Sequence, residues 1–251
     1  MMSVVMELPP SEIHIWRVRL DAAGSKSDSC SPFPGGERGW REESHGWLAP
    51  DEISRAERFH FDRDRRRFSL TRAALRRLLG SYLGVSPQEV FFRYNEYGKP
   101  YLDGWDLEFN VSHSNDVALI GLVRGADIGV DVERIRPGYP GHEIASRFFS
   151  KSETDGLSAV ADAEYALAFF RCWTRKEACV KAHGHGLSIP LDAFDVPIHP
   201  SPIDEFVTVS FNGVDWLLRD VGAEDGFAAA VAVGPGTYQI RLLDWDQTTD
   251  Q

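Results

Sequence analysis

Two acidic side chains interrupt an apolar run near the middle of the chain. Residues 128–133 read IGVDVE, which places Asp131 and Glu133 two positions apart. Because neighbouring side chains on a strand point to opposite faces, these carboxylates and Gly129 share one face. Two carboxylates so close repel each other unless a cation lies between them. The pattern indicates either a cation site or a strand end with solvated acids, and for an isolated pair the solvated interpretation is the commoner one.

A third acidic side chain lies on a predicted helix further along the chain. Trp173, Glu177 and Lys181 are spaced four apart, so they share one face of that helix. A glutamate and a lysine at this spacing most often form a surface ion pair worth about 0.3–0.5 kcal/mol. The tryptophan on the same face indicates instead that the face packs against another part of the protein.

Asp131, Glu133 and Glu177 would together supply three carboxylates and few ligands of other kinds. Oxygen ligands suit Mg²⁺ rather than zinc, for which histidine and cysteine would be expected. Such a metal can bridge a diphosphate and neutralise a leaving phosphate, while basic side chains bind the remaining phosphates. The same set would serve a Mg²⁺-dependent diphosphate hydrolase or a nucleotidyl transferase, so the residues alone leave the reaction open.

Two other features have simpler interpretations. His183 and His185 have the look of a zinc clip, but they lie in a glycine-containing turn after a helix and have no cysteine partner, which favours a plain loop. Glu153 follows a serine-containing segment and is interpreted first as an acid at a helix start, with a catalytic role left open.

Composition excludes several classes of protein. The chain has 251 residues, of which 43% are hydrophobic and 26% charged, as in a soluble globular protein of one large domain or two ordinary ones. A net charge of −11 argues against general binding of nucleic acid or of a membrane. The three cysteines form no C-x-x-C pair, and neither a signal peptide nor a membrane-spanning run is evident, so we expect a cytoplasmic protein.

Basic charge is concentrated in one segment. Nine arginines lie between residues 55 and 77, against three acids. This indicates a local anion site or, more simply, long arginines on a solvated helix face. On the longest predicted helix of this region, Arg67 and Arg72 can leave the apolar stripe and reach toward a neighbouring site.

The elements that must position these residues follow from periodicity and turn signals. Helices are predicted at 65–83, ended by Gly84, and at 165–181. Strands are predicted at 13–20, 90–94, 107–111, 117–123, 128–132, 214–218 and 227–233. The remaining predictions are a flexible insertion at 23–46, turns at 96–100 and 112–116, a turn and strand at 186–191, and a loosely packed tail after Gly234.

Helix and final strand recur at an offset of roughly 100–110 residues, the size of one small domain. We therefore predict an α/β (α+β) fold of two similar halves, 1–125 and 126–251, each a small sheet packed on a long helix. The join near residues 124–128 would lie beside Asp131 and Glu133, and clefts between domains are common ligand sites. The active site is therefore expected in the cleft between the halves.

A family resemblance arises from these same residues. Residues 128–131 (IGVD), followed by 173–181 (WTRKEACVK), resemble the signature of 4'-phosphopantetheinyl transferases. Further blocks resemble the Sfp-type branch of this family in order and spacing, namely residues 96–100 (EYGKP), 109–114 (FNVSHS), 147–150 (RFFS) and 186–191 (GLSIPL). The resemblance covers roughly residues 50–233, and the ordered set of blocks is far more specific than any single block.

The resemblance implies a pseudo-twofold pair of α/β halves and a Mg²⁺-dependent enzyme. Such an enzyme moves the phosphopantetheine arm of coenzyme A onto a serine of an apo acyl or peptidyl carrier protein and releases adenosine 3',5'-bisphosphate. Asp131, Glu133 and Glu177 match its metal-binding acids. Lys181 matches a lysine that contacts the phosphate and protonates the leaving group, while Glu177 is the candidate base, acting directly or through a metal-bound water.

The resemblance also implies the residues that bind the cofactor. Ser112 and His113 match residues at the 3'-phosphate end, whereas Arg55, Arg67 and Lys99 match further phosphate or adenine contacts. The carrier, which could serve fatty acid, polyketide or nonribosomal peptide synthesis, stays open. We expect a monomer that binds neither nucleic acid nor a membrane. A protein that binds carriers without modifying them is a third possibility. Such a protein would be expected to have lost Asp131, Glu177 or Lys181, and all three are present.

Overall fold

The structure is a computed structural model that describes residues 5–20, 46–200 and 205–245. The predicted insertion at 23–46 lies outside these residues except for Gly46. In chain order the strands and helices are β1 (Glu12–Arg19), α2 (Pro50–Glu57), α3 (Asp62–Leu83), β2 (Arg93–Tyr94), β3 (Pro100–Tyr101), β4 (Leu107–Ser114), β5 (Val117–Arg124), β6 (Ile128–Arg134), α4 (His142–Phe148), α5 (Lys151–Ser158), α6 (Asp162–His183), β7 (Val207–Phe211), β8 (Val214–Asp220), β9 (Phe227–Val233) and β10 (Gln239–Asp244).

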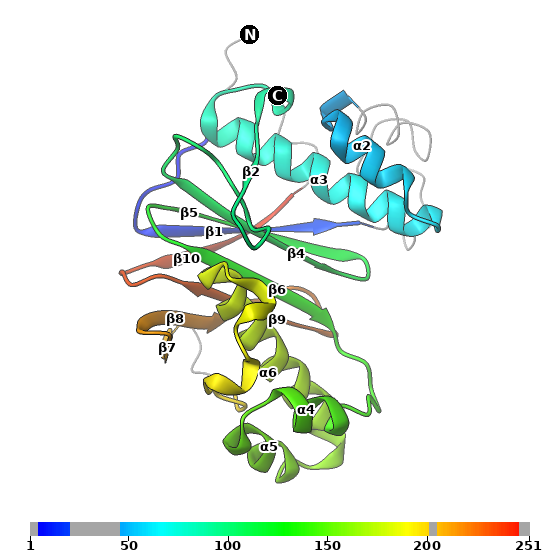
Figure 1. Ribbon diagram of the computed structural model, residues 1–251, viewed down its shortest axis with the longest axis vertical. Coiled ribbons are helices and arrows are strands. Elements are labelled where there is room, and N and C mark those ends of the chain that lie inside the picture. The colour runs from blue at the N-terminus through cyan, green and yellow to red at the C-terminus, as the bar shows by residue number, and fades with distance from the viewer. Residues whose placement is uncertain (1–4, 21–45, 201–204, 246–251) are drawn as a thin grey trace.

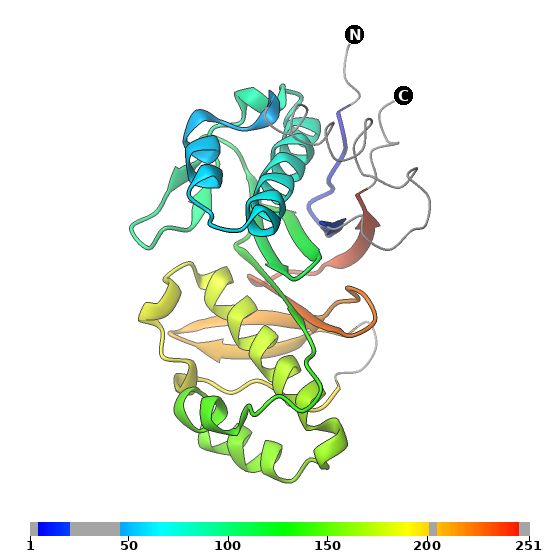
Figure 2. The same ribbon diagram turned by 90° about the vertical axis from the view of Figure 1, so that its right-hand side faces the viewer.

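The strands form two four-stranded sheets and a short hairpin. The first sheet has the order β10-β1-β5-β4, the second has the order β6-β9-β8-β7, and β2 pairs with β3. Figure 1 shows α3 and α2 beside the first sheet, with α6, α4 and α5 toward the opposite end of the molecule. In Figure 2, α6 runs along one face of the second sheet. The predicted α/β fold of two similar halves, each a small sheet packed on a long helix, is confirmed.

Side-chain alternation on the strands divides the core into layers. On β5, Ala118, Ile120 and Leu122 belong to the core beneath α3. Val117 and Leu119, on the other face, belong to a second core that lies between the two sheets. Each sheet is therefore buried on both faces, which explains why β5 and β9 read as nearly continuous apolar runs.

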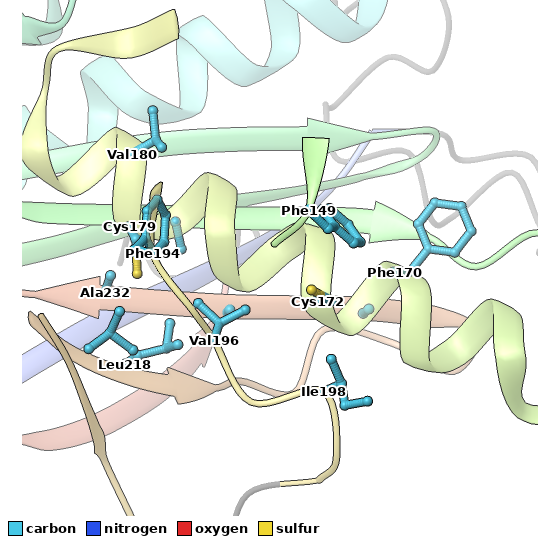
Figure 3. Packing of buried hydrophobic residues seen from close by; sticks show 14 of the residues in the cluster. Phe149, Phe170, Cys172, Cys179, Val180, Phe194, Val196, Ile198, Leu218 and Ala232 are labelled. Atoms are coloured by element: carbon cyan, nitrogen blue, oxygen red, sulfur yellow. The ribbon is translucent and has the colours of Figure 1, made fainter. Parts of the chain in front are cut away.

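The third core lies between α6 and the second sheet. Figure 3 shows this core, with Cys172 and Cys179 on the side of α6 that faces Leu218 and Ala232. Both cysteines are buried and unpaired, and burial raises the pKa of the Cys179 thiol to about 12. These thiols therefore serve as small apolar side chains in the packing.

The two long helices have the same length and the same ending. Each has 22 residues, and each is followed by a glycine in the left-handed region, Gly84 with φ 69° and Gly184 with φ 81°. The amide of each glycine donates to the carbonyl four residues earlier, Gly80 or Val180. Glycine adopts this conformation at low cost. The predicted end of the first helix at Gly84 is confirmed, whereas α6 continues to His183, two residues beyond the predicted end at 181.

Two sequence predictions on the strands of the first sheet are wrong. Strand β4 does not end at Val111 but continues to Ser114, because its polar side chains bond to a strand of the other sheet. The tail after Gly234 is not loosely packed: β10 pairs in parallel with β1 over six residue pairs. One element of the predicted second half, 126–251, is thus part of the first sheet, and the division of the chain at residue 125 stays a prediction.

Two shorter segments also differ from prediction. Residues 186–191 contain a 3₁₀ turn, Gly186–Ser188, rather than a strand, and the strand predicted at 90–94 is reduced to Arg93–Tyr94. On β1, His14 lies on the same face as Trp16 and is buried at 2% exposure. It bonds to the hydroxyl of Tyr82 in α3, so a buried polar pair joins β1 to this helix.

Candidate active site

Strand β6 and helix α6 approach each other closely at a glycine. A Cβ atom added to Gly129 would lie well inside 3.0 Å of the carbonyl oxygen of Ala178 and the amide nitrogen of Ala182. Both are backbone atoms of α6 and cannot move aside. The absence of a side chain at position 129 therefore lets α6 lie directly on β6, which brings Glu177 and Lys181 beside Asp131.

Lys181 is the centre of a hydrogen-bond cluster at this contact. Its ammonium nitrogen lies 2.6 Å from Oδ1 of Asp131, 3.0 Å from the hydroxyl of Ser112 and 3.2 Å from the carbonyl oxygen of Val130. An ammonium group has three hydrogens, so these acceptors occupy all of them. A phosphate that binds Lys181 must replace at least one of these partners.

Asp131 is buried, at 4% exposure, and only one of its carboxylate oxygens is satisfied. Oδ1 accepts from Lys181 and from Ser112, whereas Oδ2 is buried and has no hydrogen-bond partner among the described residues. A buried carboxylate oxygen without a donor is costly. A cation or a bound water at this point would remove that cost.

Glu133 and Glu177 lie close enough to Asp131 to affect each other electrostatically. Burial raises the pKa of Glu177, and the charges of Asp131 and Glu133 raise it further, while Lys181 lowers it. Burial also raises the pKa of Glu133, against the hydrogen bond from Ser114. The three predicted metal ligands are thus neighbours, but in the part of the chain that the structure describes no three acidic, histidine or cysteine side chains are arranged as a finished metal site.

Basic groups lie next to these acids. The pKa of His113 is lowered first by burial and then by the charges of Lys181 and Arg67. Helix α3, strand β4 and helix α6 therefore each contribute a cationic or potentially cationic side chain to one region. The lowered pKa of His113 indicates a concentration of positive charge that an anion would relieve.

Three other basic residues lie elsewhere. The Lys99 ammonium group donates to the carbonyl of Ala182 at 2.8 Å and lies 3.5 Å from Asp127, so it caps the end of α6 rather than projecting from a turn. Arg55 stacks over the ring of Phe68. Arg72, expected to reach toward a neighbouring site, instead bonds to buried Glu52 and helps to hold α2 on α3.

Ser112 is fully bonded within the protein. Its hydroxyl accepts from Lys181 at 3.0 Å and from the amide of Val132 at 3.3 Å, and it donates to Asp131 at 2.8 Å. A serine hydroxyl has one hydrogen and two acceptor positions. The arrangement leaves no position for a phosphate oxygen, so the role of Ser112 in cofactor binding stays a prediction.

Glu153 lies outside this cluster, in a buried ion pair. Its carboxylate is 2.8 Å from the ammonium group of Lys176 and accepts from the amides of Ser150 and Val196. Lys176 also donates to two backbone carbonyls of the segment 191–194. The pair fastens α5, α6 and this segment together, and the helix-start interpretation agrees with the capping box that Glu153 forms with Ser150.

The paired histidines lie at the end of α6. His183 is the last residue of that helix and stacks on Phe211 at a centroid distance of 5.5 Å. His185 follows the glycine cap and stacks on Tyr97 of the β2–β3 hairpin at 4.5 Å. Both rings therefore take part in aromatic packing. His185 lies in the turn, as predicted, whereas His183 belongs to the helix rather than to the turn.

Sequence reasoning on single residues missed Asn110 and Ser114. Both lie on the face of β4 that meets β6, and each accepts a β6 amide, from Val130 and Arg134 respectively. The signal was the alternation of polar side chains at 110, 112 and 114, although the strand was predicted to end at residue 111 and residues 112–116 were predicted to form a turn. Such alternation is equally typical of one strand face.

A buried acid cluster beside basic groups, at the contact of two sheets, is typical of enzymes that act on phosphate esters. Residues 127–232 match the family model described as the 4'-phosphopantetheinyl transferase superfamily. Residues 39–122 match the model described as 4'-phosphopantetheinyl transferase, N-terminal.

Individual relatives agree with these matches. The 4'-phosphopantetheinyl transferase HetI of Nostoc sp. is 35% identical over 241 residues, which span 94% of each chain. The 4'-phosphopantetheinyl transferase Sfp of Bacillus subtilis is 33% identical over 63% of this chain and 70% of its own. The chain therefore belongs to the 4'-phosphopantetheinyl transferase family and is a transferase.

One solved structure shows a slighter similarity. The holo-acyl-carrier-protein synthase of Thermotoga maritima is 22% identical, with a TM-score of 0.28 over 43% of this chain and 62% of that chain. None of the helices in the described residues combines the length and hydrophobicity needed to cross a membrane.

Proposed function

We propose that this protein transfers the 4'-phosphopantetheine group of coenzyme A to a serine of an apo acyl or peptidyl carrier protein. The products are the holo carrier and adenosine 3',5'-bisphosphate. The observation that carries the proposal is the contact between β6 and α6, where Asp131, Glu177 and Lys181 meet. Family membership supports the reaction, and this contact supports the residues that perform it.

A divalent metal fits the acids at this contact. Asp131 presents a buried oxygen without a donor. Burial first, and then the charge of Asp131, raise the pKa of Glu133 and of Glu177, and a cation would stabilise the charged form of both carboxylates. Oxygen ligands of this kind suit Mg²⁺. Asp131, Glu133 and Glu177 would hold the ion, which when bound supplies charge neutralisation for the diphosphate of coenzyme A.

The neighbouring side chains have separate roles. Glu177 takes the proton from the carrier serine, whose hydroxyl is a poor nucleophile until a base removes that proton. Lys181 turns from its present partners toward the departing phosphate and stabilises the charge that develops there.

The basic side chains near the acids bind the nucleotide end of coenzyme A. Arg67 and His113 lie near Lys181 and are the first candidates for phosphate contacts, because a guanidinium group binds phosphate through paired hydrogen bonds. Lys99 and Arg55 are included in the proposal, but each must leave the contacts described above to reach a phosphate. Ser112 would have to give up one of its three internal bonds.

The decisive experiment incubates the purified protein with labelled coenzyme A, Mg²⁺ and a panel of apo carriers from fatty acid, polyketide and nonribosomal peptide synthesis. Label should enter at least one carrier, chelation of the metal should stop incorporation, and Asp131→Ala should abolish it. Incorporation into none of the carriers, together with cleavage of coenzyme A in their absence, would indicate a diphosphate hydrolase instead. Binding of carriers without incorporation of the label would indicate a protein that binds carriers but does not modify them.

The carrier must meet a favourable surface on an acidic protein. The net charge of −11 would repel an acidic carrier at long range, so docking requires a local basic or apolar surface. The arginine-rich segment 55–77 is the first candidate for that surface. A monomer in the cytoplasm completes the proposal, and light scattering together with cell fractionation tests these two points.

A further inference from the structure

Strand β6 forms one edge of the second sheet, and side chains of β4 take the place of a pairing strand on its outer side. Three alternate amides of β6 donate to three alternate side chains of β4: Val130 to Asn110 at 3.0 Å, Val132 to Ser112 at 3.3 Å and Arg134 to Ser114 at 3.1 Å. Buried edge amides without partners would be costly. This side-chain ladder therefore fixes the register of β6 against β4 and joins the two sheets.

Ser114 forms a second hydrogen bond, which is not needed to satisfy the edge amide of β6. Its hydroxyl donates to Oε2 of Glu133 at 2.7 Å while it accepts from the amide of Arg134. Because a hydroxyl has a single hydrogen, that hydrogen is committed to the carboxylate. Glu133 is half-buried and faces the same side of β6 as Asp131, so the bond selects one orientation of its side chain.

We propose that Ser114 is a positioning residue for Glu133, holding its carboxylate in the orientation that contributes to the metal site. This inference rests on the proposed function, because it assigns Glu133 a place among the metal-binding acids. Hydrogen bonds from outside the ligand set commonly fix the orientation of metal-binding side chains, and their loss typically weakens metal affinity by about 10-fold to 100-fold.

A substitution of Ser114 tests the positioning of a metal-binding acid more selectively than a substitution of Ser112. Ser112 bonds to Asp131 and also to Lys181, so its removal would disturb an acid and a cation together. Ser114 bonds to Glu133 and to one backbone amide, and these two bonds can be followed separately.

The test compares Ser114→Ala, Ser114→Thr and a control, Ser146→Ala. Ser146 is exposed on α4 and donates only within its own helix, to the carbonyl of Glu143. Mn²⁺ binding is titrated by electron paramagnetic resonance without coenzyme A, and amide hydrogen exchange at Arg134 is followed by NMR. Rates of transfer to a carrier are measured as a function of Mg²⁺ concentration.

Ser114→Ala should weaken Mn²⁺ binding by about 10-fold and raise the Mg²⁺ concentration for half-maximal rate by a similar factor. Ser114→Thr keeps the hydroxyl and should restore both values, while Ser146→Ala should match the wild type. Faster exchange at Arg134 in Ser114→Ala with unchanged Mn²⁺ affinity would overturn the inference, because Ser114 would then only cap the strand. Failure of Ser114→Thr to restore the affinity would overturn it as well.

The outcomes also separate this inference from the proposed function. A wild-type protein that modifies carriers, and loses Mn²⁺ affinity on Glu133→Ala but not on Ser114→Ala, keeps the proposed function and overturns the inference alone. A wild-type protein that binds Mn²⁺ through Glu133 and Ser114 but modifies no carrier overturns the transfer reaction and supports the inference.

Discussion

The ammonium nitrogen of Lys181 lies 2.6 Å from Oδ1 of Asp131, joining α6 to β6. The carboxylate is buried and the ammonium group is partly exposed, with relative side-chain accessibilities of 6% and 27%. A pair in this setting is coupled, because removal of either partner leaves the other with an incompletely compensated charge. The pair also assigns one oxygen of Asp131 to the lysine and leaves the other for a cation.

This coupling predicts non-additive effects of substitution. Lys181→Met and Asp131→Asn should each slow transfer by about a hundredfold, since each removes charge stabilisation at the reacting phosphate. The double variant should be only a little slower than the slower single variant, because the two groups act together. The measurement is the initial rate of label incorporation into a carrier at saturating Mg²⁺ and coenzyme A.

An exposed pair on α5 supplies the matched control. Lys151 and Asp155 are in contact at 2.6 Å on the surface, and the corresponding Lys151→Met and Asp155→Asn variants should keep wild-type rates. Independent, multiplying effects of Lys181→Met and Asp131→Asn would contradict the coupled pair.

Gly129→Ala tests the close contact of α6 with β6. The added Cβ would collide with the backbone of α6 at Ala178 and Ala182, so the helix must shift away from the strand. We expect a loss of about 1–3 kcal/mol in the free energy of unfolding, together with a larger loss of activity than the unfolded fraction explains. Urea denaturation and the rate per folded molecule give the two values.

Gly222→Ala is the control for this change, because its added Cβ would meet only Leu242 at 3.5 Å, an ordinary contact distance. If Gly129→Ala retains both wild-type stability and wild-type rate, the helix does not depend on this contact for its position.

Glu153 is expected to stabilise the fold without taking part in transfer. Glu153→Ala leaves Lys176 fully buried without its carboxylate partner, which should cost about 3–5 kcal/mol in the free energy of unfolding. The rate per folded molecule should be unchanged, because the pair lies outside the Asp131 cluster. Denaturation curves and active-fraction-corrected kinetics separate the two effects.

Glu143→Ala, an exposed acid in the first turn of α4, is the control and should alter neither quantity. A stable Glu153→Ala protein with a greatly reduced rate would instead indicate a direct role of Glu153 in catalysis.

The buried histidine of β1 predicts a pH dependence of stability. Trp16 donates to the Tyr82 hydroxyl, which lies 2.6 Å from Nδ1 of His14, and Nε2 of His14 lies 2.9 Å from Glu12. These bonds are all satisfied by a neutral ring with its proton on Nε2. Burial lowers the pKa of His14, although the bond to Glu12 opposes this.

The folded protein therefore binds this proton less readily than the unfolded chain. The contribution of His14 to stability is full above its ordinary value of about 6.5 and falls as the pH drops below that value. His14→Gln should reduce the loss of unfolding free energy between about pH 7.5 and about pH 5.5, measured by urea denaturation. His199→Gln, at an exposed position, should leave that loss unchanged, and an equal loss in His14→Gln would refute the assignment.

Local signals predicted the elements that position most of the site. The apolar stripes of α3 and α6 and the glycines that end them depend only on neighbours in sequence. The alternation of side chains along β6 is likewise local, so it alone predicted the face that Asp131 and Glu133 share. That the glutamate of α6 lies near these acids required the family resemblance, because no local pattern specifies which strand a helix packs on.

Other features depended on partners distant in sequence. The polar residues after Val111 indicate a turn when they are considered alone. They extend β4 instead, because the hydroxyl groups of Ser112 and Ser114 accept hydrogen bonds from backbone amides of β6. Lys99, in the predicted turn at 96–100, was expected to contact the cofactor, but its ammonium group is attracted to the carbonyl of Ala182 at the end of α6. Neither interaction can be inferred from residues that are close together in the sequence.

The pairing of β10 with β1 has a consequence for biosynthesis. During translation, β1 can pair with β5 early, but its second neighbour in the sheet, β10, emerges only after β2 to β9 and the helices between them. Strand β1 therefore remains an open edge of the first sheet until residues 239–244 leave the ribosome. A parallel contact that closes so large a loop also forms slowly, so a nascent chain is exposed to mispairing along β1 until β10 has emerged and paired.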